Sequence, residues 1–299
     1  QWVYAVTPTL IIADEAANLC APDNTEPFQC WFNDDGAVYL AFFRDESSYR
    51  LRFPDLADFV VSDDGSRVTL FPQEGLSNGT MEHLWLNQVY PLALSLQGHV
   101  VLHGSAVEIG CGAVAFLGDS GVGKSTLAAS FAVTGTRFLT DDGLLLLPEG
   151  DQWLVSPSHP SLRLWRDSTE ALIADDAARA DAVTFTDKAR FLAGSNMSFC
   201  SDSRPLRAIY LLGDEDGVEA QATPLRSTDA LLACVQNSFL LDVGAREALA
   251  QQFESLSALT TRVPCFSLTY PRRYEELPRV RGFIEQHLST QNDVARATA

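Results

Sequence analysis

The sequence predicts an α/β protein with a β-rich domain over residues 1–97 and a P-loop α/β domain over residues 98–299. Two observations support this. In the first part, short runs of β-branched and aromatic residues alternate with turn residues, as in antiparallel sheets. In the second part, the apolar run Ala113–Leu117 is followed by a glycine-rich turn and then by a helical pattern, an order that is typical of a buried strand feeding a helix. The length of 299 residues suits one large domain or two ordinary ones.

The β-rich domain is expected to hold strands at 38–43 and 49–53. Asp63-Asp64-Gly65-Ser66 is a turn signal between the apolar runs 59–61 and 68–71, so this pair should form a hairpin. A helix should follow this hairpin. It would be capped near Ser77 and carry Leu84, Trp85, Val89, Leu92 and Leu96, and Pro91 should kink or split it.

The second domain alternates strand and helix patterns. We expect strands at 100–102, 106–109, 113–117, 137–140, 144–147, 208–212 and 262–270, and helices from the glycine-rich turn to about 135, at 227–240, at 245–259 and at 274–288. The polar tail after Ser289 should be frayed.

Net charge restricts the partners. The formal net charge is −18, which repels a phosphate backbone and argues against nucleic acid. No apolar run approaches 18 residues and no signal-peptide pattern is present, so we expect neither a membrane span nor secretion and place the protein in the cytoplasm. Because the chain starts at Gln1 without Met, we expect that its original start was trimmed. Self-association is left open.

The six cysteines do not indicate a metal site. None is spaced as CxxC, and no His lies at metal-ligand spacing from any of them. Cys20 and Cys30 could pair, but nothing else resembles a disulfide framework, so reduced thiols are favoured.

A phosphate-binding loop is the most specific motif in the chain. Residues 118–125 fit GxxxxGK[ST] in full, between a predicted strand and a predicted helix. Its glycines allow backbone N–H groups to point inward at an anion, and the helix N-terminus adds positive potential. Lys124 could reach the β- and γ-phosphates of ATP, and the Ser125 hydroxyl could ligate Mg²⁺. The expected nucleotide-binding residues are Gly118, Asp119, Ser120, Gly121, Val122, Gly123, Lys124, Ser125 and Thr126.

Two adjacent aspartates follow the loop closely. Asp141 lies 16 residues after Ser125, with one helix and one strand predicted in the gap. If that strand lies beside the strand before the loop, both carboxylates reach the phosphate end of the sheet. Because neighbouring strand residues point to opposite faces, Asp141 and Asp142 should differ in role, one on the Mg²⁺ side and the other accepting the proton of an incoming hydroxyl. A capped Asp-Asp-Gly turn is the structural alternative.

Basic residues elsewhere could clamp phosphates. Lys188 and Arg190 lie in the polar stretch 186–191, which could close over a nucleotide, and Arg163 could hold the γ-phosphate or the acceptor. Arg204 and Arg207 are weaker candidates of the same kind. A solvated loop and surface ion pairs are the alternatives.

Three elements together resemble the HPr kinase/phosphorylase family: His103-Gly104, the loop 118–125, and Thr140-Asp141-Asp142. The resemblance implies a phosphoenolpyruvate-carboxykinase-like core and phosphorylation of a serine hydroxyl. It further implies Asp141 as the base, Asp142 and Ser125 near Mg²⁺, and His103 beside the active site. The glycine-rich second signature of that family is missing, and residues 160–165 occupy the comparable stretch, so HPr itself is disfavoured as the substrate.

A second set of motifs looks similar to the lasso-peptide kinase branch of HPr-kinase-like proteins. They are Tyr49-Arg50-Leu51-Arg52-Phe53, Asp58-Phe59, Tyr90-Pro91-Leu92, His103-Gly104-Ser105-Ala106-Val107, Ser125-Thr126-Leu127 and Leu162-Arg163-Leu164-Trp165. The resemblance implies a kinase for a serine of a precursor peptide, typically its C-terminal serine. A small-molecule kinase on the same fold and a non-kinase ATPase switch remain alternatives, and the early Asp-Asp pair argues against the switch.

Overall fold

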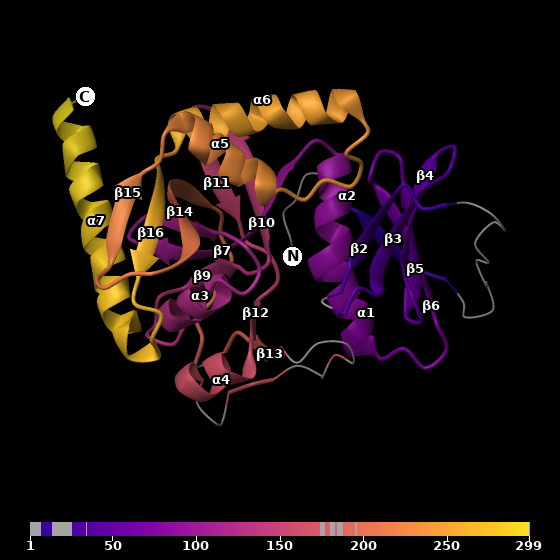
Figure 1. The fold of residues 1–299 in the computed structure, drawn as a ribbon, viewed down its shortest axis with the longest axis horizontal. Coiled ribbons are helices and arrows are strands. Elements are labelled where there is room, and N and C mark those ends of the chain that lie inside the picture. The colour runs from indigo at the N-terminus through magenta and orange to yellow at the C-terminus, as the bar shows by residue number, and fades with distance from the viewer. Residues whose placement is uncertain are drawn as a thin grey trace. The chain divides into compact units, whose positions relative to one another are not determined.

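The computed structural model describes residues 7–13, 26–33, 35–173, 177–179, 183, 188–194 and 196–298. It is a mixed α/β structure with several sheets (Figure 1). The chain divides into two compact units. Unit 1 extends up to His99 and also includes Leu240–Ala248, and unit 2 consists of Val100–Phe239 and Leu249–Ala299. The inclusion of 240–248 in unit 1 was not expected from the sequence.

Unit 1 contains a six-stranded sheet in the order β1-β6-β5-β4-β3-β2. All neighbours are antiparallel except β1 and β6. The predicted hairpin is present as β5 and β6, and Gly65 in its turn has φ +67°. The strands are β1 (Thr9–Ile12), β2 (Gln29–Phe32), β3 (Val38–Arg44), β4 (Ser48–Phe53), β5 (Ala57–Ser62) and β6 (Arg67–Pro72).

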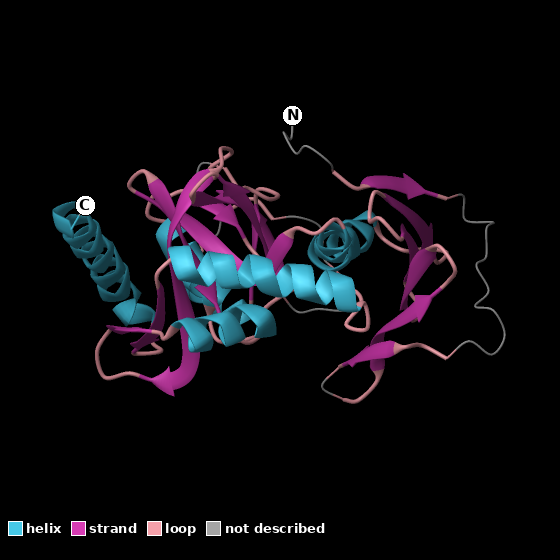
Figure 2. Ribbon diagram, turned by 90° about the horizontal axis from the view of Figure 1, so that it is seen from above, coloured by secondary structure: helices cyan, strands magenta, loops and turns pink. Residues whose placement is uncertain are grey.

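One helical segment packs on a face of this sheet (Figure 2). It consists of α1 (Asn78–Leu84), the π-helical turn η1 (Trp85–Val89) and α2 (Tyr90–Leu96). The Ser77 side chain accepts a hydrogen bond from the Thr80 N–H and caps α1 as predicted. Pro91 has no N–H to donate to the preceding turn, and the helix widens to π geometry immediately before it. The predicted interruption at Pro91 is therefore observed.

Unit 2 contains an eight-stranded sheet in the order β11-β10-β7-β8-β14-β16-β15, with β9 paired to β7, and a separate β12-β13 ribbon. β8, β14 and β16 are parallel, so their carboxyl ends lie at one edge. The strands are β7 (Val100–Ile109), β8 (Gly112–Leu117), β9 (Phe138–Thr140), β10 (Gly143–Glu149), β11 (Gln152–Ser156), β12 (Ser161–Leu164), β13 (Ala189–Leu192), β14 (Arg204–Asp216), β15 (Gln221–Pro224) and β16 (Cys265–Tyr270).

Helices cover both faces of this sheet, and β8 contributes to both cores. Phe116 packs in one core with residues of α3 and α7, whereas Leu117 packs in the other core with residues of α5 and α6. A strand buried on both sides explains the continuous apolar run in the sequence. The helices are α3 (Lys124–Ala132), α4 (Arg166–Leu172), α5 (Ser227–Gln236), α6 (Arg246–Arg262), η2 (Tyr274–Glu276) and α7 (Leu277–Thr298). The expectation of a frayed tail after Ser289 is wrong, because α7 continues to Thr298.

The position of β9 corrects a second expectation. β9 does not lie beside β8, since β7 lies between them and is antiparallel to both. Thr140 at the end of β9 pairs with Ala106, and Leu117 at the end of β8 pairs with Gly104. The residues after both strands therefore emerge at the same end of β7.

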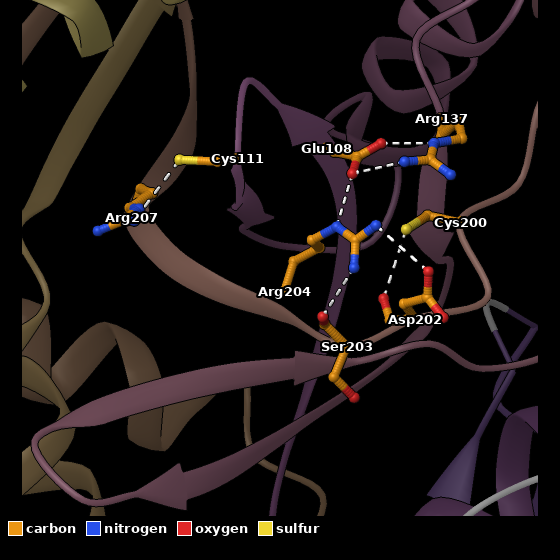
Figure 3. Close-up of polar contacts among 8 residues, drawn as sticks. All are labelled: Glu108, Cys111, Arg137, Cys200, Asp202, Ser203, Arg204 and Arg207. Atoms are coloured by element: carbon orange, nitrogen blue, oxygen red, sulfur yellow. Dashed lines mark hydrogen bonds and ion pairs between the residues drawn. The ribbon is translucent and has the colours of Figure 1, made fainter.

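An ion-pair network lies near the C-terminal end of β7, the end away from the residues that follow β8 and β9 (Figure 3). Glu108 on β7 accepts bonds from Arg137 Nε at 2.6 Å and Nη2 at 2.8 Å, and from Arg204 Nε at 2.6 Å. Arg204 also reaches Asp202 at 3.4 Å. The network connects β7, the residue before β9, and the start of β14.

None of the helices in the described part of the chain is long and apolar enough to cross a bilayer. Free thiols are present at Cys30, Cys111, Cys200, Cys234 and Cys265. Cys20, the partner considered for Cys30, lies outside the described residues.

Candidate active site at the phosphate-binding loop

The loop from Gly118 to Gly123 connects β8 to α3. Gly118, Gly121 and Gly123 have φ values of +138°, +87° and +95°, which L side chains rarely adopt. A Cβ on Gly118 would lie 2.5 Å from the Leu212 carbonyl oxygen, so no larger residue fits between β8 and β14 there. The loop backbone can therefore curl at the N-terminus of α3, where an anion is stabilised.

Lys124 provides the positive charge inside this loop. Its side chain is buried, and Nζ donates to the carbonyls of Gly118 at 2.6 Å and Asp119 at 2.8 Å. Burial lowers the pKa of Lys124 to about 8, against the opposing charges of Asp142 and Asp141. The ammonium therefore lies beside the loop backbone and is mostly protonated at pH 7.

Two residues that sequence reasoning missed also contact the loop. The Asn237 Oδ1 atom, after α5, accepts the Gly118 N–H at 3.2 Å. Arg272, two residues past the end of β16, donates from Nη1 to the Val122 carbonyl at 2.7 Å and from Nη2 to the Gly213 carbonyl. A sequence signal for Arg272 existed, since a basic residue just after a strand of a parallel sheet reaches the ligand-binding edge.

Asp141 is held by three different elements. Its Oδ1 accepts hydrogen bonds from Ser105 Oγ at 2.7 Å and from Ser125 Oγ at 2.8 Å, and its Oδ2 accepts the Arg163 N–H at 2.9 Å. Only 1% of the residue is exposed. Burial and the neighbouring Asp142 charge raise the pKa of Asp141, and its three hydrogen bonds act against this rise. The carboxylate is thus fixed against the hydroxyl expected to ligate Mg²⁺.

Asp142 has a different environment from Asp141. The two residues do not continue β9 as strand, because Asp142 has φ +66° in the turn that leads to β10. Aspartate tolerates this left-handed conformation better than most residues, and strained backbone of this kind often occurs at functional sites. Asp142 Oδ2 lies 3.4 Å from Arg163 Nη1. The environments of the two aspartates therefore differ, and a turn produces the difference instead of the alternation of a strand. That they differ in role stays a prediction.

The β12-β13 ribbon brings further positive charge to the aspartates. Arg163 and Arg190 are register partners, so their side chains share a face of the ribbon, and Arg190 Nε donates to Ser161 Oγ at 2.8 Å. Lys188 precedes β13 and lies over the Trp165 ring, with Nζ 5.2 Å from its centroid. The charge of Lys188 acts on Lys124. Thr186 and Asp187, from the same polar stretch, lie outside the described residues.

His103 lies on β7, where its N–H donates to the Asn237 carbonyl oxygen at 2.6 Å. Burial, followed by the charge of Lys124, lowers the pKa of His103 to about 4, although Asp142 acts to raise it. The imidazole is therefore neutral at pH 7. It lies close enough to the loop for the charge of Lys124 to lower its pKa, but the neutral ring adds no charge to the site.

Arg204 and Arg207 do not reach this site. Both lie near the start of β14, which pairs with the start of β8 and not with its end. Arg204 is engaged with Glu108 and Asp202, and Arg207 Nη2 lies 3.8 Å from Cys111 Sγ (Figure 3). The idea that they clamp phosphates is wrong.

The oxygen atoms at the site suit Mg²⁺. Ser125 Oγ and the carboxylates of Asp141 and Asp142 are hard donors, which is what this ion prefers. Within the described residues, no group of three or more His, Cys, Asp or Glu side chains could hold a metal by itself. Mg²⁺ is usually held by one or two carboxylates together with substrate phosphates.

No family model matches the chain, and no curated protein matches it. Among solved structures, the HPr(Ser) kinase/phosphatase from Coxiella burnetii aligns with a TM-score of 0.37 and 12% identity, covering 66% of this chain and 96% of that one.

Proposed function

We propose that this protein is an ATP- and Mg²⁺-dependent kinase that transfers the γ-phosphoryl group to a serine hydroxyl of a peptide or protein. The observation that carries the proposal is the contact of Ser125 Oγ with Asp141 Oδ1 at 2.8 Å, beside a buried lysine in a complete phosphate-binding loop. Phosphoryl transfer needs positioning and charge neutralisation more than covalent chemistry. A loop, a lysine and a fixed carboxylate in contact supply both.

ATP binding would use the inward-facing N–H groups of the loop, the N-terminus of α3 and Lys124. Ser125 and Asp141 would hold Mg²⁺ with the phosphates of ATP. Bound there, Mg²⁺ would neutralise charge on the β- and γ-phosphates. Arg163, Lys188 and Arg190 supply the remaining positive charge, in a chain whose net charge is −18.

The contacts favour a division of roles opposite to the one that the family resemblance implied. Both oxygens of Asp141 already accept hydrogen bonds, one of them from Ser125, which suits the metal side. Asp142, next along the chain, would accept the proton of the serine hydroxyl. The hydroxyl oxygen then forms a bond to the γ-phosphorus, the bond from that phosphorus to the β-phosphate oxygen breaks, and ADP leaves.

The acceptor class is proposed from sequence motifs. Short motifs in both parts of the chain resemble the lasso-peptide kinase branch, so a precursor peptide with a C-terminal serine is the first candidate. An HPr-type protein or a small metabolite is the alternative acceptor. An ATPase switch is the alternative activity, and it would hydrolyse ATP without transferring phosphate.

The test is a mass-spectrometric transfer assay with ATP and Mg²⁺. The acceptors are serine-ended precursor peptides, the protein HPr and free serine. The variants are Asp142→Asn and Asp141→Asn, with Asp151→Asn, whose side chain is fully exposed, as the matched control. Asparagine tolerates positive φ, so Asp142→Asn preserves the turn.

For the proposal to hold, wild type and Asp151→Asn must add phosphate to a peptide. Asp142→Asn should lose about 10²-fold or more in transfer rate while still binding nucleotide, and Asp141→Asn should weaken Mg²⁺-dependent nucleotide binding. Transfer only to free serine would replace the peptide acceptor with a metabolite. ATP hydrolysis that is unchanged in Asp142→Asn, without transfer to any acceptor, would refute the kinase.

A further inference from the structure

Arg272 connects three segments at the ligand-binding edge of unit 2. Nη1 donates to the Val122 carbonyl at 2.7 Å and to the Tyr270 hydroxyl at 2.7 Å, and Nη2 donates to the Gly213 carbonyl. The guanidinium lies over the Tyr270 ring, 4.1 Å from its centroid. The side chain therefore ties the phosphate-binding loop to the ends of β14 and β16.

The contact with Val122 decides the direction of one peptide group. The carbonyl of Val122 and the N–H of Gly123 belong to the same planar peptide and point in opposite directions. Because Arg272 holds the carbonyl on its own side, the Gly123 N–H is turned away from Arg272. Gly123 is the residue before α3 and has φ +95°. Because glycine has no Cβ, its backbone also accepts other conformations, so an outside contact is needed to fix this peptide in one orientation.

We infer that Arg272 is a positioning residue that presets the peptide between Val122 and Gly123, so that the Gly123 N–H faces the phosphates of a nucleotide. This inference rests on the proposed nucleotide site, but not on phosphoryl transfer. A preset donor pays no reorganisation cost when the anion arrives. The planar guanidinium is suited to this role because it presents several N–H donors in a rigid fork and spans two carbonyls.

A lysine cannot replace this geometry. Its single ammonium carries the same charge but cannot hold Val122 and Gly213 in the same fixed arrangement. If Arg272 acted only through its charge on the phosphates, lysine would retain most of the affinity. If Arg272 acts by positioning, Arg272→Lys and Arg272→Ala should both lose affinity, and free guanidinium ion should restore part of it to Arg272→Ala.

The experiment measures the binding of Mg²⁺–ADP, Mg²⁺–ATP and AMP to the full chain by calorimetry, without any acceptor. The matched control is Arg273→Ala, the adjacent arginine, whose side chain is 68% exposed. Losing a charged hydrogen-bond donor should weaken ADP and ATP binding about 10- to 100-fold in Arg272→Ala and Arg272→Lys. Arg273→Ala should bind like wild type, and millimolar guanidinium should tighten binding to Arg272→Ala and not to Arg273→Ala.

Two results would overturn the inference: nucleotide affinity unchanged in Arg272→Ala, or affinity retained in Arg272→Lys. A thermal melt of each variant identifies misfolding, and the guanidinium rescue decides the matter even if Arg272→Ala is less stable, since restored binding requires a folded loop. If wild type binds nucleotide but transfers no phosphate, the kinase proposal fails while this one stands.

Discussion

Replacing Ser105 with alanine removes a hydrogen bond to the buried carboxylate of Asp141. Ser105 is fully buried, and its Oγ lies 2.7 Å from Asp141 Oδ1. A hydrogen bond to a charged group contributes about 1.5–3 kcal/mol. We expect Ser105→Ala to lower the free energy of unfolding by about 2 kcal/mol, which for a unit of this size is a fall of about 4–8 °C in Tm.

Ser130→Ala is the control for this measurement. Ser130 is also fully buried, but its Oγ donates to the neutral Leu127 carbonyl at 2.7 Å within α3. Alanine is the better helix former, so the loss should be below about 1 kcal/mol. Urea unfolding of both variants, repeated in an Asp141→Asn background, separates the two effects. Equal losses for both serines, or no coupling between Ser105 and Asp141, would refute a charged, hydrogen-bonded Asp141.

Three further measurements test other parts of the structure. Gly65→Ala should destabilise unit 1 by about 1–3 kcal/mol in urea unfolding, because Gly65 has φ +67° and the new Cβ would lie 2.2 Å from the Ala93 carbonyl oxygen; unchanged stability would contradict that packing. ATP affinity should fall about tenfold between pH 7 and pH 9, since Lys124 has a pKa of about 8 and phosphate attracts only its protonated form; Lys124→Met should bind weakly at both pH values, and an equal pH dependence in that variant would assign the effect to another group. Glu108→Gln should lower Tm through loss of the pairs with Arg137 and Arg204. Burial raises the pKa of Glu108, but these hydrogen bonds lower it overall, so the stabilisation is fully present above the ordinary pKa of 4.5 and should shrink as pH falls from there through the lowered pKa of the folded protein; a wild-type advantage that does not shrink at all as pH falls below 4.5 would contradict the ion-pair account.

The elements that the sequence predicted well are those with a strong local pattern. The apolar run of β8 and the glycine-rich loop appear where expected because burial on two faces and positive φ both require particular residue types. Pro91 interrupts its helix for an equally local reason. The ribbon of β12 and β13 was not predicted as strands, since four-residue strands that each contain an arginine carry little periodic signal.

Residues of the site that come from distant parts of the chain were harder to find. Asn237 and Arg272 contact the loop across 119 and 150 residues of sequence, and their types are common at surfaces. The sequence does not show the order of strands in the sheet, so it could not reveal that β7 lies between β8 and β9. In contrast, the proximity of Ser125 and Asp141 followed from the short spacing between them, because one helix and one strand can hardly carry the chain elsewhere.

The position of β7 between β8 and β9 has a consequence for rearranging the chain. The strands that lead to the loop and to the aspartates both end against the same part of β7, at Gly104 and Ala106. The hairpin turn at Gly110 lies at the far end of that strand, where Ile109 pairs with Gly112. New chain termini made by circular permutation at this turn, or a peptide tag grafted into it, should leave the distance between the loop and the aspartates unchanged, because exposed turns tolerate such changes best.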